Sequence, residues 1–138
     1  MTPAAARAAV EVAINAAWGT TTTIAWPNVP FTPPLNNAKW LKVDWIWGNG
    51  AVQTKGATGG RNTVTGVLQL AIYGPKDQGD GTLDTLAETA RALFNRKRLA
   101  SPNTDVMFGA ASGPVRLFEE SWRSLVVSVP FRVEETVT

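Results

Sequence analysis

The chain contains neither cysteine nor histidine. Without cysteine there is no disulfide scaffold, no thiolate metal site and no cysteine nucleophile. Without histidine the chain lacks the commonest general base and the commonest zinc ligand, so Ser-His-Asp and Cys-His catalytic arrangements are excluded. These absences argue against an enzyme, and we expect neither a cofactor nor a catalytic residue.

Long apolar runs and a strong charge imbalance are also missing. No stretch approaches the roughly 18 apolar residues that a membrane span needs. The net charge is only +2, which by itself gives no argument for a nucleic-acid partner. The alanine-rich N-terminus lacks the basic cluster of a signal peptide and is interrupted by Glu11. We therefore expect a soluble chain that is made in the cytoplasm and has no membrane partner.

What is present is hydrophobic periodicity over 138 residues, which is the size of a single domain spanning residues 1–138. Strong helix formers run from Pro3 to about Trp18, and Gly81–Phe94 carries a clear apolar stripe, so both segments are predicted to be helices. In the first helix the stripe is narrow and is expected to lie against a partner surface. Its predicted members are Ala9, Val12, Ala13 and Ala16, with Ala5 leading into them.

Alternation with period two predicts an antiparallel sheet around the two helices. The expected fold is α+β, with a mostly antiparallel sheet of about four to six strands, an N-terminal helix and a second, central helix packed on it. The expected strands are Thr20–Ala25, Ala38–Trp47, Thr63–Tyr73, Val106–Phe108, Val115–Phe118 and Arg123–Val133.

A long loop is predicted between the two central strands, at residues 48–62. Gly48–Asn62 holds five glycines and few apolar residues. That is long for a hairpin connection, so it is expected to be mobile or functional. Lys55 and Arg61 are its polar contact candidates.

A second glycine-rich loop, YGPKDQGDGT, precedes the helix at Gly81–Phe94 and resembles a ligand cradle. A phosphate-binding loop needs Lys and then Ser or Thr after its last glycine, and that pattern is absent here. A calcium loop needs alternate acidic ligands, and this spacing also fails. An incidental site for a divalent cation on Asp77, Asp80 and Asp84 is the remaining ligand-binding alternative. The simpler interpretation is a turn whose carboxylates favour the positive end of the helix dipole.

Two charged clusters have similarly simple interpretations. Arg96, Lys97 and Arg98 follow the second helix, where cations complement the dipole, although they also fit a nucleic-acid patch. Glu119 and Glu120 are adjacent in an extended region, so they would point to opposite faces instead of forming a catalytic pair.

Six tryptophans are many for this length. Trp45 and Trp47 fall on the apolar face of their predicted strand and are expected in the core. Trp40 shares a face with Lys42 and Asp44, which indicates either a covering helix or a protein interface. We therefore name Trp40 and Lys42 as interface candidates, together with Lys55 and Arg61.

Five segments, in their order along the chain, resemble those of small phage tail proteins, in particular the tail terminator (tail completion) proteins of long, non-contractile-tailed phages. The most specific part is the strand and helix GVLQLAIYGPKDQGDGTLDTLAETARALF, followed by the closing strand WRSLVVSVPFRVEE. The other three segments are WPNVPFTPP, AKWLKVDWIWG and MFGAASGP.

The resemblance implies a structural virion protein that forms a ring, expected to be hexameric. Such a ring caps the head-proximal end of the tail tube, stops its growth and joins the tail to the head connector proteins. Its partners would be further copies of itself, the tail tube protein and the connector, with DNA only in transit. Two alternatives stay open: another ring component of the neck or tail, such as a head–tail joining or tube subunit, and a nucleic-acid-binding module.

Overall fold

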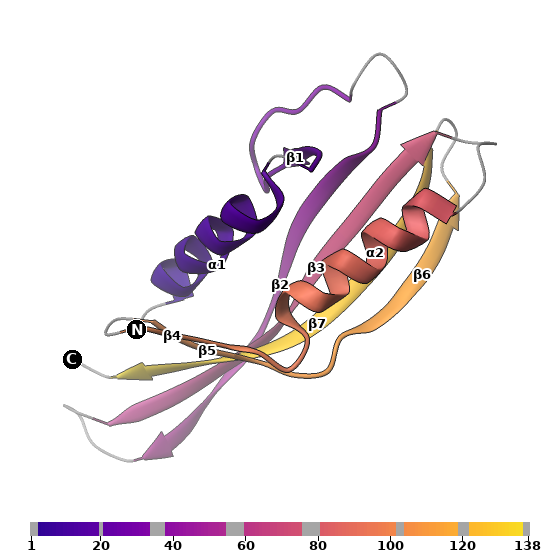
Figure 1. Cartoon of the computed structure of the whole chain (residues 1–138). Coiled ribbons are helices and arrows are strands. Elements are labelled where there is room, and N and C mark those ends of the chain that lie inside the picture. The colour runs from indigo at the N-terminus through magenta and orange to yellow at the C-terminus, as the bar shows by residue number, and fades with distance from the viewer. Residues whose placement is uncertain are drawn as a thin grey trace.

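A computed structural model describes residues 3–19, 21–33, 38–54, 60–75, 81–101, 104–118 and 122–136. Two helices accompany a twisted sheet in which three long strands run side by side (Figure 1). The elements are α1 (Pro3–Trp18), β1 (Thr23–Ala25), β2 (Trp40–Thr54), β3 (Arg61–Pro75), α2 (Gly81–Phe94), β4 (Arg98–Ser101), β5 (Thr104–Phe108), β6 (Ser112–Phe118) and β7 (Trp122–Thr136).

The α+β class is confirmed, and the sheet is mostly antiparallel as predicted. The strand order is β1-β2-β3-β7-β5-β4. β6 lies off this path and pairs with β7 on the same edge as β5, along a different part of that strand. The short β1 is parallel to β2, while the other pairs are antiparallel. Seven strands exceed the four to six expected, because β4 was not recognised from its sequence.

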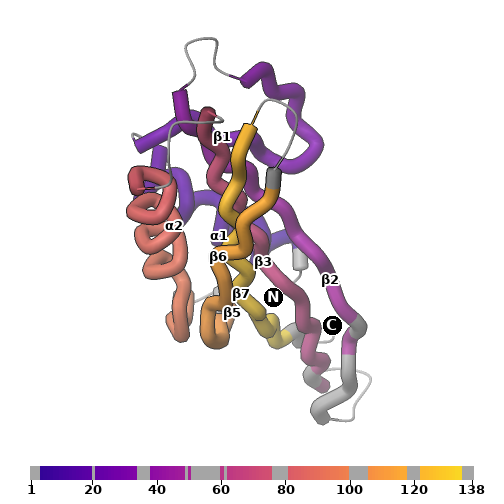
Figure 2. Tube along the Cα trace, turned by 90° about the vertical axis from the view of Figure 1, so that its right-hand side faces the viewer, coloured from indigo at the N-terminus to yellow at the C-terminus, as the bar shows by residue number. Residues whose placement is uncertain are grey.

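The predicted loop at residues 48–62 is wrong at both ends. β2 continues to Thr54 and β3 starts at Arg61, so most of the segment is a paired hairpin. Glycine is depleted in strands, which explains the error. The register shifts between Trp47 and Gly50, and a bulge of this kind accommodates glycines within a strand. The ends of β2 and β3 thereby extend past both helices (Figures 1 and 2).

Helix α1 covers its predicted range but buries a different stripe. Val10, Ile14 and Trp18 are completely buried, whereas Val12 is 69% exposed. Residues four apart share a helix face, and this face carries the bulkiest side chains of the helix. Burying them removes more apolar surface from water than burying alanines would. The predicted stripe through Val12 is therefore corrected to Ala6, Val10, Ile14 and Trp18.

Helix α2 matches the prediction in both its bounds and its apolar stripe. Leu83, Ala87, Ala90 and Phe94 are buried, and Leu86 and Leu93 pack against the core they form. Both helices contribute to the same cluster as one face of the sheet, which we call the helix face. Its sheet members include Leu41, Val43, Leu68, Leu70, Ile72, Leu125, Val127, Val129, Phe131 and Val133.

The opposite side of the sheet, the open face, has a second and smaller cluster. Trp40 stacks on Tyr73 with ring centroids 4.0 Å apart, and it meets Phe31 and Trp122 at 4.9 and 5.9 Å. These rings come from β2, β3, β7 and the proline-rich segment after β1. Aromatic contacts between distant segments thus cover this end of the open face without a helix.

Candidate interface surfaces

The structure describes three of the four predicted interface residues, each at a different place. Trp40 lies inside the aromatic cluster and is only 7% exposed. Lys42 is two residues along the same strand; its side chain is about half exposed and lies 3.7 Å from Asp44. Arg61 begins β3, where it pairs with Thr54 and with the end of β7. Lys55 lies outside the described residues.

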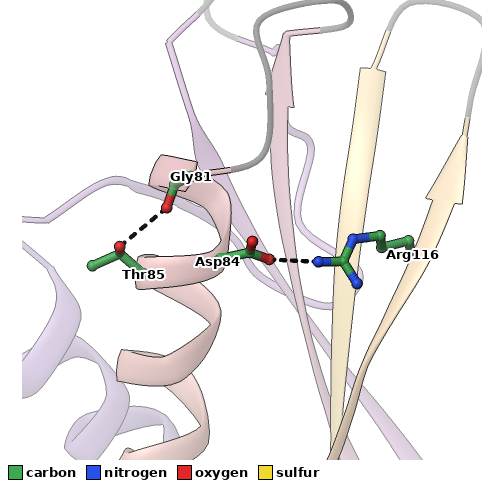
Figure 3. A network of polar contacts seen from close by, with 4 residues as sticks. All are labelled: Gly81, Asp84, Thr85 and Arg116. Carbon is green, nitrogen blue, oxygen red and sulfur yellow. Dashed lines mark hydrogen bonds and ion pairs between the residues drawn. The ribbon is translucent and has the colours of Figure 1, made fainter.

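The predicted glycine-rich loop before α2 is described only at its two ends, since β3 continues to Pro75 and α2 starts at Gly81. Asp77 and Asp80 lie outside the described residues. The third member of that predicted group, Asp84, accepts a hydrogen bond from Arg116 of β6 at 2.9 Å (Figure 3). This pair joins the first turn of α2 to the sheet. Within the ranges described above, no group of three acidic residues is arranged to hold a metal ion.

The basic segment after α2 is part of a tight turn. Arg96 adopts a φ of 55° and its amide donates to the carbonyl of Gly109, while Lys97 accepts from the amide of Phe108. These backbone bonds tie the end of α2 to β5, and the side chains of Arg96, Lys97 and Arg98 are exposed. The Glu119–Glu120 pair falls outside the described residues.

The predicted core position of Trp47 is only partly correct. Trp45 and Trp47 stack with centroids 5.6 Å apart, and both rings meet Phe131 edge-on at 5.3 and 5.1 Å. Trp45 is half-buried, but Trp47 is 37% exposed. This end of the hairpin therefore presents an aromatic surface to its surroundings.

Exposed apolar side chains on the sheet were not identified from the sequence. Val115 is 58% exposed and Leu117 48% on β6, and Ile46 is 51% exposed on β2. The register puts all three on the open face: Val115 lies beside Val126, Leu117 beside Ser124, and Ile46 beside Val67. Alternation could have grouped them by face within each strand, but their common face depends on the strand pairing and their exposure on the folded structure.

A cavity of about 310 Å³ opens beside β2 at the point where β1 stops pairing with it. Its wall includes Trp40, whose indole N–H finds no acceptor in the described part of the chain. The proline-rich segment forms the other wall. The full lining is Ala25, Trp26, Pro27, Asn28, Val29, Phe31, Trp40, Lys42, Val43 and Asp44.

Across the described ranges, no helix is both long and apolar enough to cross a membrane.

Comparison with known proteins identifies a family. A family model described as phage tail terminator protein matches residues 5–131, which confirms the resemblance seen in the sequence. No curated protein matches the chain. Among the solved structures that match, one superposes with a TM-score of 0.74 at 22% sequence identity, and the alignment covers 96% of each chain. At that identity the likeness supports the fold alone.

Proposed function

Since the chain belongs to the phage tail terminator family, as its match over residues 5–131 shows, we propose that it forms the ring that ends a tail tube. The family is one of structural phage tail proteins. The chain is accordingly a structural component of a phage tail, with its place in the virion. The family match carries this proposal, because it spans nearly the whole chain.

In the proposed assembly, six copies close a ring on the head-proximal end of the tube. The ring stops tube growth and presents its other side to the head connector, and DNA passes through its centre without being held. Apolar side chains exposed on β2 and β6, namely Ile46, Val115 and Leu117, support an assembled state, since they would be covered by neighbours.

We further propose that Trp40, Lys42, Lys55 and Arg61 serve the interfaces of this ring with its neighbours or with the tube. Lys42 offers an exposed cation next to the cavity beside β2. Trp40, being buried, would act indirectly by holding the proline-rich segment in place. Arg61 lies at the far end of the long hairpin, which extends past the helices.

The oligomeric state tests the proposal most directly. Native mass spectrometry and negative-stain electron microscopy of the purified chain, alone and with tail tubes of its phage, are expected to show rings of six. A chain that stays monomeric under both conditions and leaves tube length unchanged contradicts it.

Particles made without this protein separate the terminator from the other ring components. Over-long tails are expected if the chain stops tube growth. Absent tubes would instead assign it as a tube subunit, and normal tails detached from heads would assign it to head–tail joining. A DNA titration at low salt is expected to be flat, and salt-sensitive binding would favour the nucleic-acid-binding alternative.

A further inference from the structure

Strand β2 has an open edge next to the helices. It pairs with β3 along its length, but on its other side β1 reaches only Trp40–Lys42. From Val43 to Trp47, where the first register shift begins, no described residue pairs with this edge. Unpaired N–H and C=O groups in a row form a template for another strand.

This edge has few of the features that usually prevent pairing. Soluble proteins protect edge strands with lysine, proline, bulges or a covering segment. From Val43 to Trp47 the edge has one charged residue, Asp44, and no lysine or proline, and the bulge of β2 comes only after Trp47. Ile46 and Trp47 are both exposed along the regular part. An apolar edge of this kind is expected to be covered by a partner.

The cavity at the start of the open edge gives a partner strand a place to anchor. Val43 and Asp44, the first residues without a strand beside them, line it together with Trp40. Trp40 is more than nine-tenths buried, and its indole N–H has no acceptor among the described residues. A strand added here would bring both a side chain of suitable size and carbonyl oxygens.

We propose that the partner is strand β6 of a second copy of this chain. This inference rests on the proposed ring, because it identifies the contact between neighbouring subunits. β6 pairs with β7 on one side, and no described strand pairs with its other side. Pro114 and a register shift interrupt β6 before Val115, so the contact would use Val115–Phe118. It exposes Val115 and Leu117 on the open face, the same face on which β2 exposes Ile46. Pairing the two edges would therefore join the exposed apolar side chains into one surface.

The strand directions fit such a contact. β6 is antiparallel to β7, β7 to β3, and β3 to β2, so β6 runs opposite to β2. Rotation about an axis along the strands preserves these directions, and β6 of the next copy would meet β2 as an antiparallel neighbour. A contact that uses two different surfaces of one chain closes into a ring when the rotation closes.

A stagger between neighbouring copies is required. The registers across the sheet place Val115 of β6 level with Lys42 of β2. The open edge of β2 starts one residue later, at Val43, and continues toward Trp47. The neighbouring β6 must therefore slide along β2. Closing a sheet on itself requires tilted strands and a stagger of this kind.

Engineered disulfides can test the pairing because the chain has no cysteine of its own. The panel combines Asp44→Cys or Ile46→Cys with Val115→Cys or Leu117→Cys. Facing Cβ atoms of paired strands come close enough for a disulfide. Within one chain, β2 and β6 are separated by three strand spacings, about 14 Å, so a cross-link must join two chains. Val12→Cys with Leu117→Cys is the control, since Val12 is exposed on α1.

At least one pair of the panel is expected to give a ladder of reducible multimers on non-reducing gels, while the control gives monomer. Ile46→Lys is expected to abolish rings, and Val12→Lys to leave them intact. Rings that persist in Ile46→Lys, with no pair of the panel cross-linking or with equal cross-linking of the control, overturn the pairing and leave the ring proposal standing. A wild-type chain that never assembles, with or without tubes, overturns both.

Discussion

Asp84 in the first turn of α2 and Arg116 on β6 are joined by an ion pair of 2.9 Å that links the central helix to the edge of the sheet (Figure 3). The carboxylate is also placed near the positive end of the helix dipole, which favours it there. Arg116 lies on β6 beside Leu125, so its side chain points to the helix face. The pair thus orients the strand whose opposite face exposes Val115 and Leu117.

Breaking this ion pair is expected to cost little stability. Both side chains are nearly half exposed, and exposed ion pairs contribute about 0–1 kcal/mol to the free energy of unfolding. Asp84→Ala should therefore lower that free energy by less than about 1 kcal/mol in urea titrations, with the loss shrinking as salt is added. A larger, salt-independent loss would show that the pair acts as more than a surface contact.

Two positions on α1 should respond very differently to truncation. Trp18 is completely buried, and Trp18→Ala is expected to cost about 3–5 kcal/mol through lost burial and the cavity left behind. Val12 is 69% exposed, so Val12→Ala should change the free energy of unfolding by less than about 0.5 kcal/mol. Urea unfolding followed by circular dichroism measures both. The opposite ranking would support the stripe first predicted from the alanines.

Helix α1 shows that hydrophobic periodicity predicts a helix but not always its buried face. The helical spacing in α1 is compatible with more than one apolar stripe, and the position of the sheet determines which stripe is buried. In α2 a single face holds nearly all of the large apolar side chains, so its bounds and buried face were predicted from the sequence. The long strands were recognised by the same logic, since each alternates strongly.

The candidate interface was harder to predict because pairing between distant residues determines it. Trp40 was expected under a helix or in an interface, yet it is covered by Phe31, Tyr73 and Trp122 from three other segments. The edge of β2 is open because β1 pairs with only its first three residues. No local sequence pattern predicts where that pairing ends. Such relationships arise from tertiary structure and not from the propensity of a single segment.

Gly66 on β3 is expected to tolerate no side chain. A Cβ there would lie 2.5 Å from the carbonyl oxygen of Ile46 and 2.6 Å from the ring of Phe131. The backbone oxygen cannot rotate away as a side chain can, so Gly66→Ala should cost about 1–3 kcal/mol. Gly81→Ala is the control, since nothing lies within 4 Å of a Cβ at that site. Equal stabilities of the two variants in thermal unfolding would contradict the crowding at Gly66.

Arg96→Gly is expected to stabilise the protein. Arg96 has a φ of 55°, a left-handed conformation that costs an L-residue with a Cβ about 1–2 kcal/mol but costs glycine almost nothing. Part of that gain is offset by the greater freedom of glycine in the unfolded chain, so a net increase of about 0.5–1 kcal/mol is expected.

The matched control for this change is Lys97→Gly. Lys97 neighbours Arg96 in the same turn and is equally exposed, but its φ is not positive. Its replacement should lower the free energy of unfolding by about 0.4–1 kcal/mol through the entropy of the unfolded chain alone. Urea titrations of the two variants should therefore shift in opposite directions from the wild type. A loss of stability in both would mean that the contacts of the Arg96 side chain outweigh its backbone strain.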